Sequence, residues 1–275
     1  MINIVTCDWL KDKKREENIV IVDVRFQLQD SDAGRKAYLE GHIPGAVYLD
    51  LKKDLSGIPQ KHGGSHPLPD VDTFAAKLRH IGVSQDKTVV IYDTKNDMFA
   101  SRAGWLLYYV GHKNVNLLDG GLDAWVKEGN ELTTEIPTLS EGTFQPHVRT
   151  NETVDMNTVK GRSEDVVLID SRSYDRYLGK TEPLYKKSGH IPGATNVFWK
   201  GVLREDGSWK NTDELESHFQ DIPKDKEIIV SCGSGVSACP NVIGLKKIGY
   251  TNVKLYPGSY SDWISYEENT VEKGE

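Results

Sequence analysis

The sequence is poor in cysteine, with only Cys7, Cys232 and Cys239 among its 275 residues. Three cysteines do not make a disulfide framework, and such a set is typical of a reducing compartment. The first residues also lack the basic stretch, the long apolar stretch and the cleavage site of a secretory signal. We therefore expect a cytoplasmic protein.

Two further absences narrow the range of partners. No stretch approaches the roughly 18 consecutive apolar residues of a membrane-spanning helix. Basic residues are not in excess, with 34 lysines and arginines against 41 aspartates and glutamates. The formal net charge of −7 argues against a nucleic acid or an anionic membrane as a partner. An anionic substrate would have to be attracted by positive groups near its own site.

The chain contains an internal duplication. Residues 19–25 (IVIVDVR) return 147 residues later as VVLIDSR, and residues 41–46 (GHIPGA) return unchanged 148 residues later. Each half is long enough to form its own core. Residues 133–150 are rich in Thr, Pro, Glu and Ser and have no sustained period, as in a linker. We place an N-terminal domain at residues 1–135, a linker at 136–148 and a C-terminal domain at 149–275.

Short runs of β-branched residues alternate with helical patterns in both halves. The runs are continuously apolar, which predicts strands buried on both faces of a parallel sheet. Residues 71–80 carry apolar side chains at helical spacing, and residues 212–219 take the same place in the second half. The expected fold class is α/β, with two tandem domains that are each a mainly parallel sheet flanked by helices. Ligands of such sheets bind beyond the carboxyl ends of the strands.

Cys232 stands at such a strand end, after the apolar run 227–230 and before a helical pattern. Backbone N–H groups at the start of a helix favour negative charge, and hence a reactive thiolate. Glycines allow consecutive amides to curl around an anion. We interpret Cys232 as a nucleophile; the alternative is a cysteine buried in the core. The amides that would surround its sulfur belong to the loop residues Gly233, Ser234, Gly235, Val236, Ser237 and Ala238.

The first half has no such loop. Asp93 takes the place of Cys232 and is followed by Thr94, Lys95 and Asn96, with neither a nucleophile nor a glycine. A carboxylate at this position would repel an anionic substrate. We therefore expect the N-terminal domain to be catalytically silent.

Three other chemistries fail on particular residues. A cysteine phosphatase needs an arginine at the sixth position after its cysteine, where this chain has Ala238. The eight histidines are scattered, so we expect no metal site. The Gly-Ser-Gly loop lacks both the Lys-Ser/Thr of a Walker A loop and the third glycine of the dinucleotide fingerprint. We expect no cofactor.

The duplicated Asp-x-Arg and His-Ile-Pro-Gly-Ala motifs, the Cys-Gly-Ser-Gly-Val-Ser-Ala loop and the ending Gly-Ser-Tyr-Ser-Asp-Trp resemble the rhodanese sulfurtransferase family over essentially the whole chain. The resemblance implies two rhodanese domains, of which only the C-terminal one is active. It also implies transfer of a sulfane sulfur through a Cys232 persulfide to cyanide or a thiol, such as a dithiol or a thioredoxin-like protein.

The resemblance extends to the sulfur donor. In this family the loop pattern Cys-Arg-Lys-Gly-Val-Thr is typical of thiosulfate enzymes, and Cys-Gly-Ser/Thr-Gly-Val-Thr is typical of 3-mercaptopyruvate enzymes. This chain resembles the second pattern, with Gly233 and Ser234 at its second and third positions. A loop without cations would also serve the dianion thiosulfate poorly. Arg176 matches the first of two arginines that hold the donor carboxylate. The second is missing. Lys186 or Lys187 is the candidate substitute, with Lys186 chosen, although lysine lacks a bidentate fork and a solvated surface is the alternative role of both.

The resemblance also implies a Ser–His–Asp relay beside the cysteine, for which the candidates are Ser234 and His66. For the aspartate, residues 50–54 offer both Asp50 and Asp54, of which we choose Asp54. His42 and His190 recur in both halves and are expected to be structural, and Cys239 is expected to be buried. The favoured function is therefore a 3-mercaptopyruvate sulfurtransferase. The alternatives are a thiosulfate sulfurtransferase, a persulfide-relay module acting on protein acceptors and a non-catalytic regulatory tandem. The last of these is disfavoured because the second half keeps its cysteine and loop.

Overall fold

The computed structural model describes residues 2–14, 16, 18–96 and 98–274, and the chain forms two compact units. Unit 1 comprises Met1–Gly57, Pro69–Arg149 and Leu203–Trp209, and unit 2 comprises Ile58–Leu68, Thr150–Val202 and Lys210–Glu275. Each unit thus takes one short segment from the opposite half of the sequence. No helix in the described part of the chain is long and apolar enough to span a membrane.

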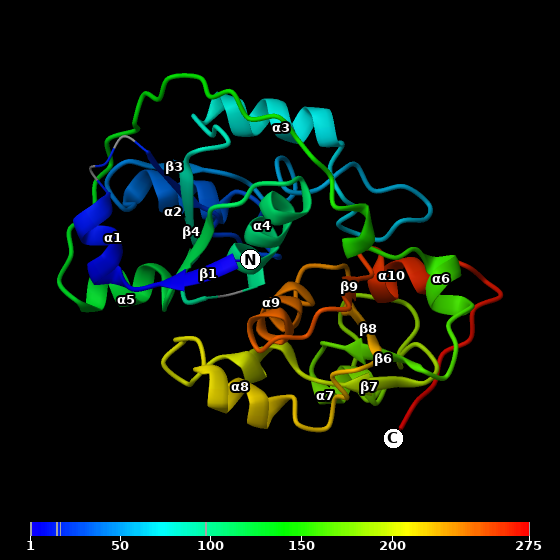
Figure 1. Cartoon of the computed structure of the whole chain (residues 1–275). Coiled ribbons are helices and arrows are strands. Elements are labelled where there is room, and N and C mark those ends of the chain that lie inside the picture. Colours follow the sequence, from blue (N-terminus) through cyan, green and yellow to red (C-terminus); the bar gives the residue numbers. More distant parts are fainter. Residues whose placement is uncertain (1, 15, 17, 97, 275) are drawn as a thin grey trace. The chain divides into compact units, whose positions relative to one another are not determined.

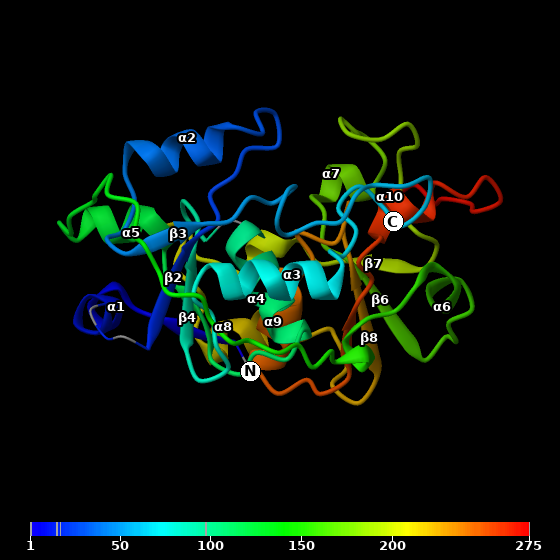
Figure 2. The ribbon, with the colours of Figure 1, turned by 90° about the horizontal axis from the view of Figure 1, so that it is seen from above.

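Unit 1 is built on a five-stranded parallel sheet with the strand order β1-β5-β4-β2-β3. Its strands lie between α1 and α5 on one side and α3 and α4 on the other (Figure 2). The strands are β1 (Ile2–Val5), β2 (Ile19–Asp23), β3 (Ala46–Tyr48), β4 (Thr88–Tyr92) and β5 (Val115–Leu118). The helices are α1 (Cys7–Lys13), α2 (Ala33–Glu40), α3 (Val71–His80), α4 (Met98–Tyr109) and α5 (Gly121–Lys127).

Unit 2 repeats this plan with a four-stranded parallel sheet in the order β7-β6-β8-β9 (Figure 1). Its strands are β6 (Val166–Asp170), β7 (Ala194–Asn196), β8 (Glu227–Ser231) and β9 (Val253–Leu255). The α-helices are α6 (Met156–Lys160), α7 (Tyr174–Tyr177), α8 (Thr212–His218), α9 (Cys239–Lys247) and α10 (Ser259–Trp263), and two 3-10 turns are η1 (Thr150–Glu152) and η2 (Trp199–Val202). The α/β fold expected from the sequence, with a parallel sheet in each half, is confirmed.

The two sheets differ by one strand because the duplicate of β1 is reduced to a single bridge. Thr153 pairs with Leu255 in parallel, and Val154 N–H donates to the Leu255 carbonyl at 3.0 Å. Residues 134–149, before this bridge, contain no regular element in the described chain and run along unit 1 with Phe144 fully buried. The boundary within 136–148 remains our proposal for where the duplicated halves join.

The Asp-x-Arg and His-Ile-Pro-Gly motifs tie strand ends to turns inside each unit. In unit 2, Arg172 donates to the Asp170 carboxylate at 2.5 Å and to the Gly189 carbonyl at 2.7 Å. His190 bonds the Tyr177 carbonyl through Nδ1 and stacks on the Tyr177 ring at 3.9 Å. Unit 1 repeats these contacts through Asp23, Arg25, Gly41, Tyr38 and His42. These contacts agree with the structural role expected for both histidines.

His218 makes the stability of unit 2 sensitive to acid. Burial, with a smaller contribution from the charge of Lys210, lowers the pKa of His218 from 6.5 to about 4. The unfolded chain therefore binds a proton between these two pH values that the folded chain excludes. Stability that is complete above pH 6.5 is lost as the pH falls from 6.5 towards 4.

We expect the His218→Phe variant to lose less stability on acidification than the parent. Between pH 7 and pH 5 the difference should be about 1–2 kcal/mol, because the pKa shift applies to a partly buried ring. Urea unfolding at the two pH values measures it. An equal loss of stability in both proteins would show that protonation of His218 in the unfolded chain does not cause the loss.

Candidate active site

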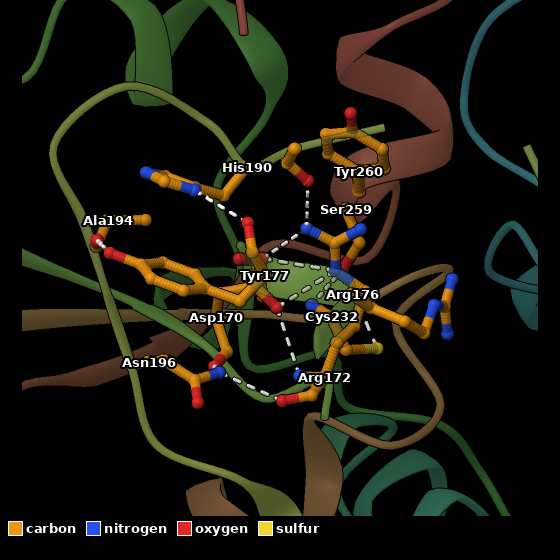
Figure 3. Close-up of polar contacts among 12 residues, drawn as sticks. Asp170, Arg172, Arg176, Tyr177, His190, Ala194, Asn196, Cys232, Ser259 and Tyr260 are labelled. Carbon is orange, nitrogen blue, oxygen red and sulfur yellow. Dashed lines mark hydrogen bonds and ion pairs between the residues drawn. The ribbon is translucent and has the colours of Figure 1, made fainter. Parts of the chain in front are cut away.

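Cys232 lies directly after β8, at the carboxyl edge of the unit 2 sheet, and is 1% exposed. Its N–H donates to Ser259 Oγ at 3.0 Å, and the same oxygen lies 4.0 Å from the Cys232 sulfur (Figure 3). Its carbonyl accepts from Tyr260 N–H at 3.0 Å. The first residues of α10 therefore hold the cysteine backbone and contact its sulfur.

The loop after Cys232 requires glycine at position 235. Gly235 has φ +74°, in the left-handed region, and a methyl group there would lie 2.2 Å from the Pro257 carbonyl oxygen. The Gly233 carbonyl accepts from Ser261 N–H at 2.9 Å. The loop is thus bent against residues 257–261 in a conformation that only glycine allows.

The bend leaves several backbone donors unused. Among the residues that the structure describes, no acceptor exists for the N–H groups of Ser234, Val236, Ser237 and Ala238. Val236 is 4% exposed and Ala238 is fully buried. A buried N–H without an acceptor costs about 1–3 kcal/mol. Successive donors of this kind form an anion-binding concavity, here in the loop that directly follows Cys232.

In unit 1 the position that corresponds to Cys232 is occupied by the carboxylate of Asp93. The Asp93 carboxylate accepts from Ala100 N–H at 2.8 Å, and Ala100 takes the place of Cys239. The Asp93 carbonyl accepts from Leu122 N–H at 2.9 Å, just as the Cys232 carbonyl accepts from Tyr260. A buried carboxylate thus occupies in unit 1 the position at which unit 2 presents a thiol.

Ser259 is a site residue that the sequence did not single out. Its φ is 52°, in the left-handed region that favours glycine, and its counterpart in unit 1 is Gly121 with φ 61°. A serine in this conformation costs about 1–2 kcal/mol, a strain that is found mostly at functional sites. The signal was present in the sequence, since the duplicated ending has Gly-Gly in one half and Gly-Ser in the other.

We expect the Ser259→Gly variant to be less active than the parent and more stable than Ser259→Ala. Both variants lose the hydroxyl, which accepts from Cys232 N–H at 3.0 Å and donates to the Tyr256 carbonyl at 2.8 Å, and only glycine also removes the backbone strain. The stabilities of the two variants should differ by about 1–2 kcal/mol, and kcat/KM should fall about tenfold in both, the equivalent of one lost hydrogen bond. Thermal unfolding and steady-state turnover on the same preparations test this. Equal stability of the two variants, or an unchanged kcat/KM, would contradict it.

The segment Ile58–Leu68 belongs to unit 2 and brings His66 to the loop. His66 Nδ1 lies 2.8 Å from Ser234 Oγ. The segment is anchored by the Gly63 and Ser65 N–H groups, which donate to Asp262 and Ser261 at 2.7 and 3.0 Å. The sequence-predicted pair Ser234 and His66 is therefore adjacent, and its catalytic role remains a prediction.

The other predicted relay member, Asp54, lies in unit 1. Its carboxylate binds Lys77 Nζ at 2.9 Å and accepts from Asp50 N–H at 2.8 Å. Asp54 is thus paired with Lys77 inside unit 1. Its part in the relay remains a prediction.

Arg176 reaches the loop and is held by an acidic partner. A methyl group on Gly233 would lie 3.6 Å from Arg176 Nη2. This nitrogen donates to the two Glu182 oxygens at 2.8 and 3.0 Å, and Glu182 also accepts from buried Arg172 at 3.1 Å. Lys186 is exposed, and within the described chain no hydrogen bond or ion pair links it to the loop. Arg176 is thus the cation that the fold brings to Gly233.

Tyr185 is a second site residue missed from the sequence. A methyl group on Gly233 would lie 3.0 Å from Tyr185 Oη. Burial foremost, and then the charge of Cys232, raise the pKa of Tyr185, while Arg176 and hydrogen bonds with Ser234 and Ser65 oppose the rise. The residue lies in the stretch where the resemblance led us to expect an arginine.

The remaining cysteines lie in buried settings. Cys239 is fully buried, with its sulfur 3.4 Å from the Gly235 carbonyl oxygen. Burial foremost raises the pKa of Cys7 to about 12, so that this thiol stays protonated. In the described part of the chain, no three His, Cys, Asp or Glu side chains are grouped to hold a metal ion.

Comparison with known proteins gives consistent matches. The model of the rhodanese-like domain matches residues 6–128 and again 156–266. A probable 3-mercaptopyruvate sulfurtransferase of Pseudomonas aeruginosa is 37% identical in an alignment of 280 positions that covers 99% of this chain and 98% of the relative. A putative thiosulfate sulfurtransferase of Mycobacterium tuberculosis, SseB, is 37% identical over 261 residues, 93% of this chain and 91% of the relative. The crystal structure of SseA from Escherichia coli, reported for the rhodanese fold of 3-mercaptopyruvate sulfotransferases, matches with TM-score 0.84 and 37% identity over 95% of this chain and 100% of that one.

Proposed function

This chain belongs to the rhodanese-like family and is a sulfurtransferase, and on that basis we propose that it moves sulfur from 3-mercaptopyruvate to a thiol or to cyanide through a persulfide on Cys232. The observation that carries the proposal is the set of loop N–H groups without acceptors beside a buried strand-end cysteine. A persulfide Cys–S–S⁻ supplies the anion that these donors lack.

The first half-reaction loads the cysteine. The Cys232 thiolate attacks the sulfur of the donor, a new S–S bond forms and the C–S bond breaks. The electron pair of the C–S bond passes to the carbon fragment, which leaves as the enolate of pyruvate. The thiol proton of the donor ends on the methyl carbon of pyruvate, and the enzyme keeps Cys–S–S⁻.

Ser234 and His66 are suited to carry that proton. Their side chains lie 2.8 Å apart, within hydrogen-bond distance, and histidine is the side chain most often used in general acid–base catalysis. Because His66 comes from residue stretch 58–68, the relay depends on that segment being folded onto unit 2. Arg176 would bind the donor carboxylate with the N–H groups that Glu182 leaves unoccupied.

The second half-reaction returns the enzyme to its thiolate form. An acceptor thiolate or cyanide attacks the outer sulfur, takes it, and leaves Cys232 as the thiolate. Dithiols and thioredoxin-like proteins are the acceptors that we propose. Donor and acceptor alternate, so the kinetics should be ping-pong.

The choice of donor rests on the loop. Gly233 and Ser234 place no cation beside Cys232, and Arg176 is already paired with Glu182. A keto acid with a single negative charge needs less positive charge than dianionic thiosulfate does. Thiosulfate is the second candidate donor, because SseB, named as a putative thiosulfate sulfurtransferase, is as similar in sequence as the relative from Pseudomonas aeruginosa.

Turnover of the two donors, measured side by side with cyanide and with a dithiol, tests the proposal. We expect kcat/KM to be higher for 3-mercaptopyruvate than for thiosulfate with either acceptor. The reverse order would replace the proposed donor by thiosulfate. Failure of both donors, with loading of Cys232 by a protein persulfide, would instead indicate a relay module.

A further inference from the structure

Tyr185 lies in the segment 181–187, in which the resemblance led us to expect a second arginine. Tyr185 Oη and Arg176 Nη2 lie 3.0 and 3.6 Å from the same point, the position of a methyl group on Gly233. The Arg176 guanidinium carbon is 5.6 Å from the centre of the Tyr185 ring. One charged donor and one neutral donor thus face the loop one residue after the nucleophile.

The Tyr185 side chain is fixed in this place. Its ring packs against the core of unit 2, with its centre 6.0 Å from that of Tyr260. The hydroxyls of Ser234 and Ser65 act on the phenol and partly oppose the effect of burial on its pKa. Burial foremost raises its pKa above the usual 10, so the phenol keeps its proton at neutral pH. A rigid, neutral O–H donor therefore stands beside Cys232.

We infer that Tyr185 is a catalytic residue, whose O–H hydrogen-bonds to the keto oxygen of the donor and stabilises the enolate that forms as the C–S bond breaks. This role rests on the proposed function. No oxidant or reductant enters the step, because the C–S electron pair moves onto the carbonyl and the new S–S bond uses the Cys232 lone pair. Donors preorganised toward developing negative charge are among the strongest contributions to catalysis.

The hydrogen-bond network leaves the phenol proton available for this task. His66 Nδ1 lies 2.8 Å from Ser234 Oγ, and the Ser234 hydroxyl opposes the rise in the pKa of Tyr185 that burial causes, as a donor to the phenol oxygen does. In this arrangement the O–H of Tyr185 can donate to the substrate, and the acceptor positions of the phenol oxygen are already used. The same chain of groups can afterwards return a proton to the carbon of the enolate.

The assignment also explains donor choice by chemistry. Cleavage of thiosulfate releases sulfite and forms no enolate, so a neutral phenol has nothing to stabilise. The Cβ atom of an arginine at position 233, as in the thiosulfate-type loop, would lie only 3.0 Å from Tyr185 Oη. Tyr185 and Gly233 are therefore complementary features of a site for keto acids.

The test is the Tyr185→Phe variant, which keeps the ring and its packing and removes only the hydroxyl. With 3-mercaptopyruvate we expect kcat to fall about 100-fold with little change in KM, because the bond strengthens only in the transition state. With thiosulfate, kcat/KM should stay within about threefold of the parent, a change too small to count as lost transition-state stabilisation. Tyr174→Phe, at a residue that is 46% exposed, is the matched control and should leave both donors unaffected.

Each other result overturns the assignment. An unchanged kcat for 3-mercaptopyruvate would show that the phenol does not touch the enolate. An equal fall with both donors would reduce Tyr185 to a structural role. A parent protein that turns over thiosulfate and not 3-mercaptopyruvate would overturn the proposed function as well, and that result is visible before any variant is made.

Discussion

Replacing Cys232 with serine should abolish sulfur transfer, with a loss on the order of 10⁴-fold or more in kcat/KM for either donor. A serine hydroxyl is a poor nucleophile at neutral pH and cannot form a persulfide. The fold should survive, because serine is nearly isosteric and the hydrogen bonds of Cys232 N–H to Ser259 and of Tyr260 N–H to the Cys232 carbonyl use the backbone of residue 232. Steady-state turnover with each donor, and circular dichroism of the variant, measure both parts.

Cys239→Ser is the matched control for this experiment. Cys239 is seven residues further along the chain, fully buried at the start of α9, with its sulfur against the Gly235 carbonyl. Serine can donate to the same carbonyl, so turnover should remain largely intact. Equal losses in the two variants would mean that Cys239 takes part in transfer and that its burial was misinterpreted.

A single methyl group at Gly235 should cost more activity than any other small change in the loop. Alanine would have to adopt φ +74° with its methyl group 2.2 Å from the Pro257 carbonyl oxygen, so the loop must move. The N–H groups of the loop after Cys232 would then lose the arrangement in which they can bind an anion together. We expect kcat/KM to fall at least about 100-fold, the usual cost of losing one preorganised donor from such a site.

Gly249 offers a matched control for the effect of positive φ alone. Its φ is +90°, and a methyl group there meets no described atom within 4 Å. Gly249→Ala should lower stability by about 1–2 kcal/mol, the general cost of this conformation, and leave turnover unchanged. Comparable activity in the Gly235→Ala and Gly249→Ala variants would contradict the role of the loop.

Much of the fold was readable from the sequence because its signals are local. Continuous β-branched runs predicted the central strands, and apolar spacing predicted α3, which spans Val71–His80 as expected. The duplication supplied the repeated architecture. The position of Cys232 at a strand end followed from the same signals, since β8 ends at Ser231.

The features that were missed depend on contacts distant in sequence. Nothing local indicates that residues 58–68 pack on unit 2, because the bonds of Gly63 and Ser65 reach partners almost 200 residues away. Tyr185 lies in a segment without regular structure, so its approach to Gly233 depends on the path of the loop. Arg176 was identified from sequence, but its pairing with Glu182 was not.

The central claim is that 3-mercaptopyruvate loads its sulfur onto Cys232. Mixing the protein with this donor without any acceptor, followed by mass spectrometry of the intact chain and its peptides, tests the claim most directly. We predict a gain of the mass of one sulfur atom on the peptide that contains Cys232, with one pyruvate released per chain. Pyruvate formation without added mass, or added sulfur on Cys7 or Cys239, would contradict it.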